Sequence, residues 1–489
     1  MLSNDAKILQ LEAATRRRFL CDAGLSLGGV ALASLLGGAS SSLADGDGVP
    51  STGGFKPQHH FAPRAKSVIF IHCAGAPPQH DLFDLKPALD RYNGQPCPDE
   101  YLKGEKFAFI KGHPTLLASP FKFAHFGRSG MELSTLLPGM GSIADELTLL
   151  RGMKTDQFNH APAQLLMHTG EARFGHPSMG AWLSYGLGSA TAQLPSFVVL
   201  VSGDKTPDAG KSVWGSGFLP GQFQGVQCRT VGESVLYLDD PRGTTRASRR
   251  AALDAMRDLN AMSPFADAST RARVEQFEMA YRMQMSVPEA TALSSESAET
   301  LALYGATPGA ASFANNCLLA RRLVERGVRF VQLFDWGWDA HGTGPNDDLL
   351  HQLPKKCLET DRPSAGLVLD LKRRGLLDET LVIWGGEFGR TPMVEYRNGV
   401  KTFIGRDHHP HCFSMWMAGG GVKKGLVYGA TDELGYFATE GIVHVQDLQA
   451  TILALLGFDH ERLTYRHAGL DQRLTGVTKP SRVVHEIMA

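Results

Sequence analysis

Short apolar runs recur along the chain and are separated by longer stretches in which apolar and polar residues mix with helical spacing. Apolar runs of this length, bounded by turn residues, are typical of buried strands. Their alternation with helical stretches predicts an α/β fold built on a largely parallel sheet. The predicted strands cover residues 67–73, 147–151, 196–202, 330–334, 381–384 and 413–417.

Two helical regions interrupt or close this pattern. Between residues 242 and 325 the chain becomes helical, and we interpret this region as a helical insertion or cover. Residues 447–456 predict a closing amphipathic helix that ends at Gly457. The apolar face of the insertion is formed by Val274, Phe277, Tyr281 and Met285.

The N-terminus carries the most specific pattern in the chain. Residues 15–20 read Thr-Arg-Arg-Arg-Phe-Leu, a weakly apolar run follows at 23–39, and Ser-Leu-Ala at 42–44 supplies small residues for a signal peptidase. This arrangement resembles a twin-arginine signal peptide, which we expect to span residues 1–44. Residues 45–63 lack apolar periodicity and are interpreted as a linker.

The signal predicts the twin-arginine translocation machinery as a partner and the periplasm or the extracellular space as the location. The apolar run is shorter than the roughly 20 residues that cross a bilayer, and no later stretch reaches that length, so we expect no stable membrane span. Twin-arginine export carries proteins that are already folded. This route therefore favours a protein with a bound metal.

Composition and charge exclude several classes of protein. Of the 489 residues, 43% are hydrophobic and 20% are charged, as in ordinary globular proteins and unlike disordered or collagen-like chains. The formal net charge of −1 shows no basic excess, so we expect no nucleic-acid partner. Six cysteines remain after the signal, widely spaced, and we expect most of them to be buried free thiols, with any pairing left open.

Polar residues gather after the predicted strands, which is where open α/β sheets bind ligands. A Gly- and Pro-rich turn after the first strand brings Asp81 and Asp84, which are candidate metal ligands. After the 330–334 strand come Asp339 and His341, a carboxylate and an imidazole two residues apart that could converge on a divalent cation.

Two further segments carry candidate chemistry. After the 381–384 strand come Glu387 and Arg390, and the guanidinium of Arg390 could hold an oxyanion or pair with Glu387. Residues 405–411 contain three imidazoles and an aspartate, a density that packing does not explain. His408 is the candidate ligand within that segment.

These segments together resemble the bacterial proteins of domain of unknown function 1501, a branch of the alkaline phosphatase and sulfatase superfamily. The resemblance implies a three-layer α/β sandwich over residues 64–480, followed by a tail at 481–489. It also implies two divalent metals at the carboxyl edge of the sheet: Asp339, His341 and His408 resemble one set of ligands, and Asp81 or Asp84 with Glu387 a second. The segments that carry it are residues 66–87, 338–342, 386–392, 405–408, 418–421, 429–432 and 445–457.

The chain departs from the superfamily at the position of the nucleophile. Where sulfatases carry a Cys or Ser two residues before a Pro, this chain has His160 before Pro162, and Gln164 stands in place of an Arg. In addition, Glu387 is followed by Phe388 rather than by a histidine. The resemblance thus leaves His160 either a metal ligand or a covalent nucleophile.

Three functions follow from these observations. The first is a metal-dependent hydrolase of phosphate or sulfate esters, with His160 and Arg390 as catalytic residues and either Arg390 or Arg406 holding the oxyanion. The second is a non-catalytic binding protein on the same scaffold, since a fold does not determine a function. The third is a structural or maturation partner of other exported proteins. The sequence leaves the substrate, the oligomeric state and the metal open, with zinc, manganese, iron and calcium as candidates.

Overall fold

The structure is a computed structural model that describes residues 59–202, 205–229, 235, 245–262, 268–396 and 401–489. The predicted signal peptide and most of the predicted linker lie outside these residues. The chain divides into two compact units, residues 1–51 with 237–284, and residues 52–236 with 285–489. In the first unit the structure describes α8 (Arg246–Met262) and the beginning of α9 (Ala268–Thr291).

The second unit is built on a central sheet that has nine strands in the described part of the chain, in the order β12-β4-β11-β8-β1-β7-β5-β6, with β15 also paired to β4. Neighbouring strands are parallel except where β11 runs antiparallel to β8 and β4. The strands are β1 (Ser67–Ala74), β4 (Leu147–Lys154), β5 (Phe197–Ser202), β6 (Val226–Cys228), β7 (Phe330–Trp336), β8 (Thr380–Gly385), β11 (Phe413–Ala418), β12 (Leu426–Tyr428) and β15 (Val443–His444).

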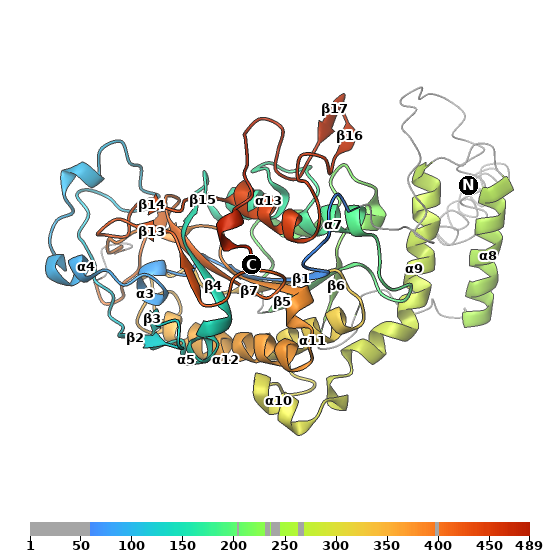
Figure 1. The fold of residues 1–489 in the computed structure, drawn as a ribbon, viewed down its shortest axis with the longest axis horizontal. Helices are drawn as coiled ribbons and strands as arrows, with labels where there is room; N and C mark the ends of the chain where they lie inside the picture. The colour runs from blue at the N-terminus through green and yellow to red at the C-terminus, as the bar shows by residue number, and fades with distance from the viewer. Residues whose placement is uncertain (1–58, 203–204, 230–234, 236–244, 263–267, 397–400) are drawn as a thin grey trace, which may run out of the picture. The chain divides into compact units, whose positions relative to one another are not determined.

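Helices cover both faces of this sheet (Figure 1). On one face lie α5 (Pro138–Ser142), α11 (Phe313–Glu325) and α12 (Gln352–Arg373). On the other lie α6 (His160–Thr169), α7 (Met179–Leu187) and α13 (Val445–Leu455). The predicted class, a three-layer α/β sandwich with a mostly parallel central sheet, is confirmed.

The core explains why the strands are continuous apolar runs. All eight residues of β1 are buried, because helices shield the strand on both sides. Val68 and Phe70 belong to a large apolar cluster on the side of α6, α7 and α13. Ile69 and Ile71 alternate with them and are also fully buried. One strand therefore contributes to two cores.

In the region predicted as a helical insertion, residues 242–325, most of the described residues lie in helices. Besides α8 and α9 it contains α10 (Ala298–Tyr304) and α11. Helix α11 packs on β1, β5 and β7, so the end of the region belongs to a layer of the sandwich.

Shorter elements lie around the sheet. The helices among them are α3 (Gln79–Leu82) and α4 (Pro87–Tyr92). Four strand pairs stand apart from the central sheet: β2 (Phe123–Phe126) with β3 (Met131–Ser134), β9 (Gly389–Arg390) with β10 (His408–His409), β13 (Ala430–Thr431) with β14 (Ala438–Glu440), and β16 (Tyr465–His467) with β17 (Leu470–Gln472).

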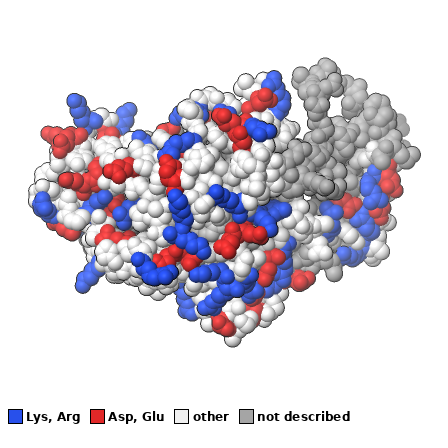
Figure 2. All heavy atoms as spheres, viewed as in Figure 1, with Lys and Arg blue, Asp and Glu red and all other residues white. Residues whose placement is uncertain are grey.

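The surface charges and the cysteines are those of an ordinary globular protein. On the visible face, basic and acidic side chains are interspersed (Figure 2). The six cysteines in the described residues are buried and free, as expected for most of them. Among the described helices, none combines the length and the apolar character that a membrane crossing requires.

Candidate metal centre

Four side chains meet at the carboxyl edge of the central sheet, although they come from distant parts of the chain. Asp339 and His341 follow β7, His408 lies on β10, and His160 is the first residue of α6, the helix that follows β4. Each offers one ligand atom, and these atoms all lie within 4.8 Å of one another. Strands β4 and β7 run in the same direction, and β11, which follows the His408 segment, runs antiparallel to them and begins where they end. The end of β4, the end of β7 and the start of β11 therefore lie at one edge.

The three imidazoles of this cluster are held in the same way. Nδ1 of His160 donates to Glu387 Oε1 at 2.7 Å, and Nδ1 of His341 donates to Glu395 Oε2 at 2.6 Å. Nδ1 of His408 donates to the backbone oxygen of Phe158 at 2.7 Å. Because these acceptors carry no hydrogen, each Nδ1 must carry one. The three Nε2 atoms are thereby left to face the centre of the cluster.

Two of these Nε2 atoms lie unusually close together. Nε2 of His341 and Nε2 of His408 are 3.0 Å apart, and Asp339 Oδ1 lies 2.7 Å from the first and 3.4 Å from the second. Burial lowers the pKa of His408 to about 3, so at pH 7 its Nε2 bears a lone pair. Nitrogen ligands about 2.1 Å from one ion stand roughly 3.0–3.4 Å apart. The spacing therefore fits a shared cation.

Arg390 holds the carboxylate of the cluster. Its guanidinium donates to Asp339 Oδ1, to the backbone oxygen of Ala76 at 3.1 Å, to that of Arg406 at 2.9 Å, and to that of Gly75. Burial opposes the charge on Asp339, but the neighbouring Arg390 and the three imidazoles lower its pKa below the usual value. The predicted oxyanion-binding residue thus has acceptors within the protein at each of its nitrogen atoms.

Glu387 contacts the Nδ1 side of the His160 ring, which faces away from the centre of the cluster. Besides the His160 ring, its carboxylate accepts from the backbone N–H of Gly75 at 3.1 Å and from Nε2 of Gln164 at 3.2 Å. His72 Nε2 lies 3.2 Å from the other carboxylate oxygen, and both side chains are fully buried. Burial opposes ionisation, yet these partners hold the pKa of Glu387 well below its usual value. Glu387 is therefore a charged residue that orients the His160 ring.

The charge on His160 follows from the same neighbours. Burial disfavours an imidazolium, but contacts with Asp339 and Glu387 outweigh it and raise the pKa of His160 to about 9. Without a metal, the ring is therefore protonated on both nitrogens and positively charged at pH 7. The carboxylates of Asp339, Glu387 and Glu395 face the positive charges of Arg390 and of this protonated ring. The site keeps an excess of one negative charge, which favours a cation there.

Backbone pairing fixes the ligands relative to one another. In the β9–β10 pair, His408 stands opposite Arg390. Gly405 forms single bridges with both His341 and Glu395. A side chain at Gly405 would overlap the backbone, since its Cβ would lie 2.2 Å from the carbonyl carbon of His341. Glycine is required there for close approach.

Aromatic rings line the cluster. Phe388 packs against His160 and His408, with ring centroids 4.9 and 4.6 Å away. Phe109 meets His408 edge to face, and its ring is held over the site because Asp407 Oδ2 accepts from the backbone N–H of Phe109 at 2.8 Å. These rings reduce the access of water to the imidazoles.

The remaining predicted ligands lie outside the four-residue cluster. Both carboxylate oxygens of Asp81 accept from Arg406, at 2.7 and 3.1 Å, and both side chains are fully buried. Asp84 accepts from Thr431 and lies 3.0 Å from Nζ of Lys86. The structure thus brings together Asp339, His341, His408 and His160, and gives the two turn carboxylates other partners.

Sequence reasoning missed two residues of this site. Glu395 is 54 positions from His341, and Phe109 comes from a segment whose pattern predicts no element. Neither belongs to a motif with ligand spacing. The sequence signal for Glu395 is weak: it lies three residues beyond the 386–392 segment that carries Glu387 and Arg390.

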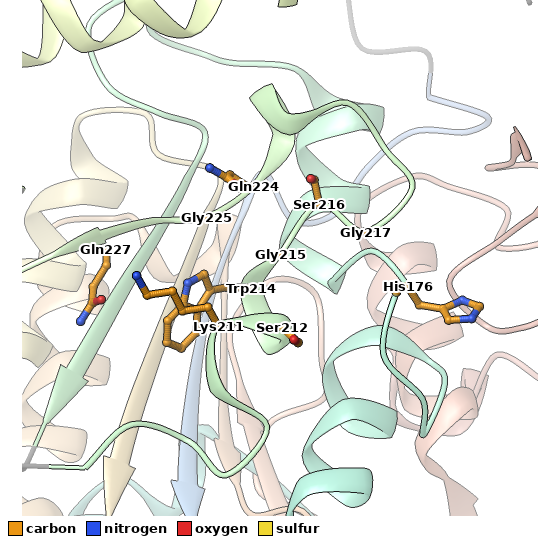
Figure 3. A pocket seen from close by; sticks show the side chains of 11 residues that line it. His176, Lys211, Ser212, Trp214, Gly215, Ser216, Gly217, Gln224, Gly225 and Gln227 are labelled. Carbon is orange, nitrogen blue, oxygen red and sulfur yellow. The ribbon is translucent and has the colours of Figure 1, made fainter. Parts of the chain in front are cut away.

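A pocket of about 490 Å³ lies apart from the cluster (Figure 3). Its walls come from the short helix η4 (Gly210–Trp214), the loop after α6 and the edge strand β6. None of the residues that line it belongs to the imidazole cluster.

Comparison with solved structures finds distant similarity to a lipoteichoic acid synthase, a sulfatase and an alkaline phosphatase. The lipoteichoic acid synthase LtaP from Listeria monocytogenes is 10% identical (84% of this chain, 74% of that chain, TM-score 0.34). The sulfatase PsFucS1 from Pseudoalteromonas sp. is 13% identical (86% and 73%, TM-score 0.37), and the alkaline phosphatase from the Antarctic bacterium TAB5 is 11% identical (80% and 98%, TM-score 0.31).

The central sheet, the helices on both of its faces and the cluster at its carboxyl edge define an α/β sandwich protein with a candidate metal centre. Residues 65–488 match the family model described as "Protein of unknown function (DUF1501)", and the chain belongs to that family. The family resemblance in the sequence is therefore confirmed. No curated protein matches the chain in sequence.

Proposed function

We propose that the protein is an exported, metal-dependent hydrolase of phosphate or sulfate esters. The observation that carries the proposal is the 3.0 Å distance between Nε2 of His341 and Nε2 of His408. Because the Nδ1 atom of each ring donates to an acceptor outside the cluster, both Nε2 atoms face the same point as the Asp339 carboxylate. Asp339, His341 and His408 would hold the ion. A bound divalent ion would supply a Lewis acid that neutralises the ester oxygens.

The residues around the ion would prepare the site. Glu395 holds the His341 ring in the orientation that directs Nε2 inward. Arg390 keeps Asp339 ionised and fixed. Phe109 and Phe388 limit the water around these charges, which strengthens their interaction with an anionic ester. The twin-arginine signal and a periplasmic or extracellular location belong to this proposal.

The test combines metal content with turnover. Protein purified after export is analysed by elemental mass spectrometry, then assayed on 4-nitrophenyl phosphate and 4-nitrophenyl sulfate with added zinc, manganese, iron or calcium. We expect bound metal and turnover, and the loss of both in His341→Ala. His351→Ala is the matched control, because that exposed imidazole pairs with Asp348 outside the cluster.

A non-catalytic binding protein is the second candidate. The hydrogen bonds of Arg390 favour the binding protein, because every nitrogen of its guanidinium already donates to an acceptor within the protein. Stoichiometric metal without turnover of either ester would favour this function over the hydrolase.

A further inference from the structure

We infer that His160 is the fourth ligand of a three-imidazole, one-carboxylate metal centre, and not a covalent nucleophile. The inference rests on the metal centre of the proposed function and is independent of whether esters are turned over. Its starting point is the position of the ring. His160 is the first residue of α6, whereas the other ligands follow β7 or lie on β10, so its side chain reaches the cluster from a separate element.

The orientation of the ring follows from its hydrogen bond. Because Nδ1 donates to Glu387 Oε1 at 2.7 Å, Nε2 is turned toward Asp339 Oδ2, 3.4 Å away. The ring of His408 is 4.5 Å away between centroids. His160 therefore points at the same place as the two other imidazoles.

The buried Nε2 atom makes no hydrogen bond that meets geometric criteria among the described residues, and its nearest charged group is the Asp339 carboxylate. A metal ion at the cluster centre would take the place of the proton on Nε2 and bind both groups. The carboxylate of Glu387 would then orient a metal-bound imidazole, as Glu395 does for His341.

The same geometry argues against a nucleophilic His160. Attack would require a phosphorus or sulfur atom at van der Waals distance or less from Nε2. That space is where the ligand atoms of Asp339, His341 and His408 converge within 4.8 Å. A tetrahedral phosphate or sulfate group placed there would displace the metal ion to which, in the proposed function, the ester binds.

The ligand set also defines the class of metal. Three imidazoles and one carboxylate suit a first-row transition ion such as zinc, iron or cobalt, whereas calcium prefers oxygen ligands. Among the metals considered from the sequence, this inference favours zinc, manganese and iron over calcium.

The experiment titrates cobalt(II) into the full-length, chelator-treated protein and measures affinity by competition with a chelator, with the visible absorption of cobalt as the second readout. We compare the parent with His160→Ala, His160→Gln and the control His176→Ala, an imidazole outside the cluster. Loss of a supporting residue lowers metal affinity by about 10–100-fold. Loss of a ligand should exceed about 100-fold and change the cobalt spectrum, while His176→Ala matches the parent.

Several outcomes would overturn the inference. One is unchanged affinity and spectrum in both folded His160 variants, with folding checked by circular dichroism. Another is an ester-derived adduct on His160 in the intact mass of the parent. A parent that binds no cobalt, zinc, manganese or iron would overturn it together with the metal centre. If His160 proves essential for metal but no ester is hydrolysed, the inference stands and the hydrolase proposal fails.

Discussion

The buried pair of Asp81 and Arg406 offers a test that separates a structural carboxylate from a metal ligand. In the Asp81→Asn variant the side chain keeps its shape but loses its charge. Arg406 then remains fully buried without its counter-ion, with the backbone oxygens of Leu117 and Thr391 as its other acceptors.

Removing one partner of a buried ion pair costs about 3–5 kcal/mol. Because Arg406 keeps two carbonyl acceptors, we expect the lower end of this range, about 3 kcal/mol. With an unfolding entropy of roughly 2.1 cal/mol/K per residue, this loss corresponds to a melting temperature lower by about 3 °C for a domain of this size.

The assay is differential scanning calorimetry of the metal-loaded protein together with its metal content. We expect Asp81→Asn to melt earlier and to keep its metal. Asp90→Asn, an exposed carboxylate on the next helix, should stay within about 0.5 kcal/mol of the parent. A variant that loses metal while its metal-free form melts like the metal-free parent would refute the reasoning and make Asp81 a ligand.

Three further changes test other parts of the structure. Glu395→Gln should lower metal affinity by about 10–100-fold, because the His341 ring loses its charged anchor, and a competition titration measures this. In the metal-free protein the pKa of His160 is raised from 6.5 to about 9, so its contribution to stability is complete below pH 6.5 and is lost as the pH rises through 9. Melting curves from pH 6 to 10 should show this loss in the parent, and a His160→Gln variant with an equal loss would contradict it. Gly170→Ala should destabilise the fold, since the new Cβ would lie 1.7 Å from the Leu474 oxygen at a φ of +74°; a parent-like melting temperature would show that the backbone adapts.

The strands of the core could be predicted because their physical signal is local. Six apolar runs correspond to β1, β4, β5, β7, β8 and β11, and their predicted bounds differ from the observed ones by at most three residues. The antiparallel direction of β11 could not be predicted, since a continuous apolar run is the same whichever way it points. The short edge strands β6 and β12 are only partly buried and too short for a periodic pattern.

The site was predictable only where chemistry is concentrated in the sequence. Asp339 and His341 stand two residues apart, and His408 belongs to a dense imidazole segment. The partner of Asp81 is 325 residues away, and nothing in the turn indicates that Arg406 occupies both of its oxygens. For His160, the role depends on which nitrogen faces Glu387, a property of ring orientation that a sequence does not contain.

The backbone bridges at Gly405 bear on where the protein acquires its ion. Because these bridges join the His341, Glu395 and His408 segments through main-chain contacts, the ligands are positioned by folding itself. Under the proposed twin-arginine export, which carries folded proteins, these contacts would form in the cytoplasm. The ligand set would then be complete before the protein crosses the membrane, and ions present in the cytoplasm would be the first to reach it.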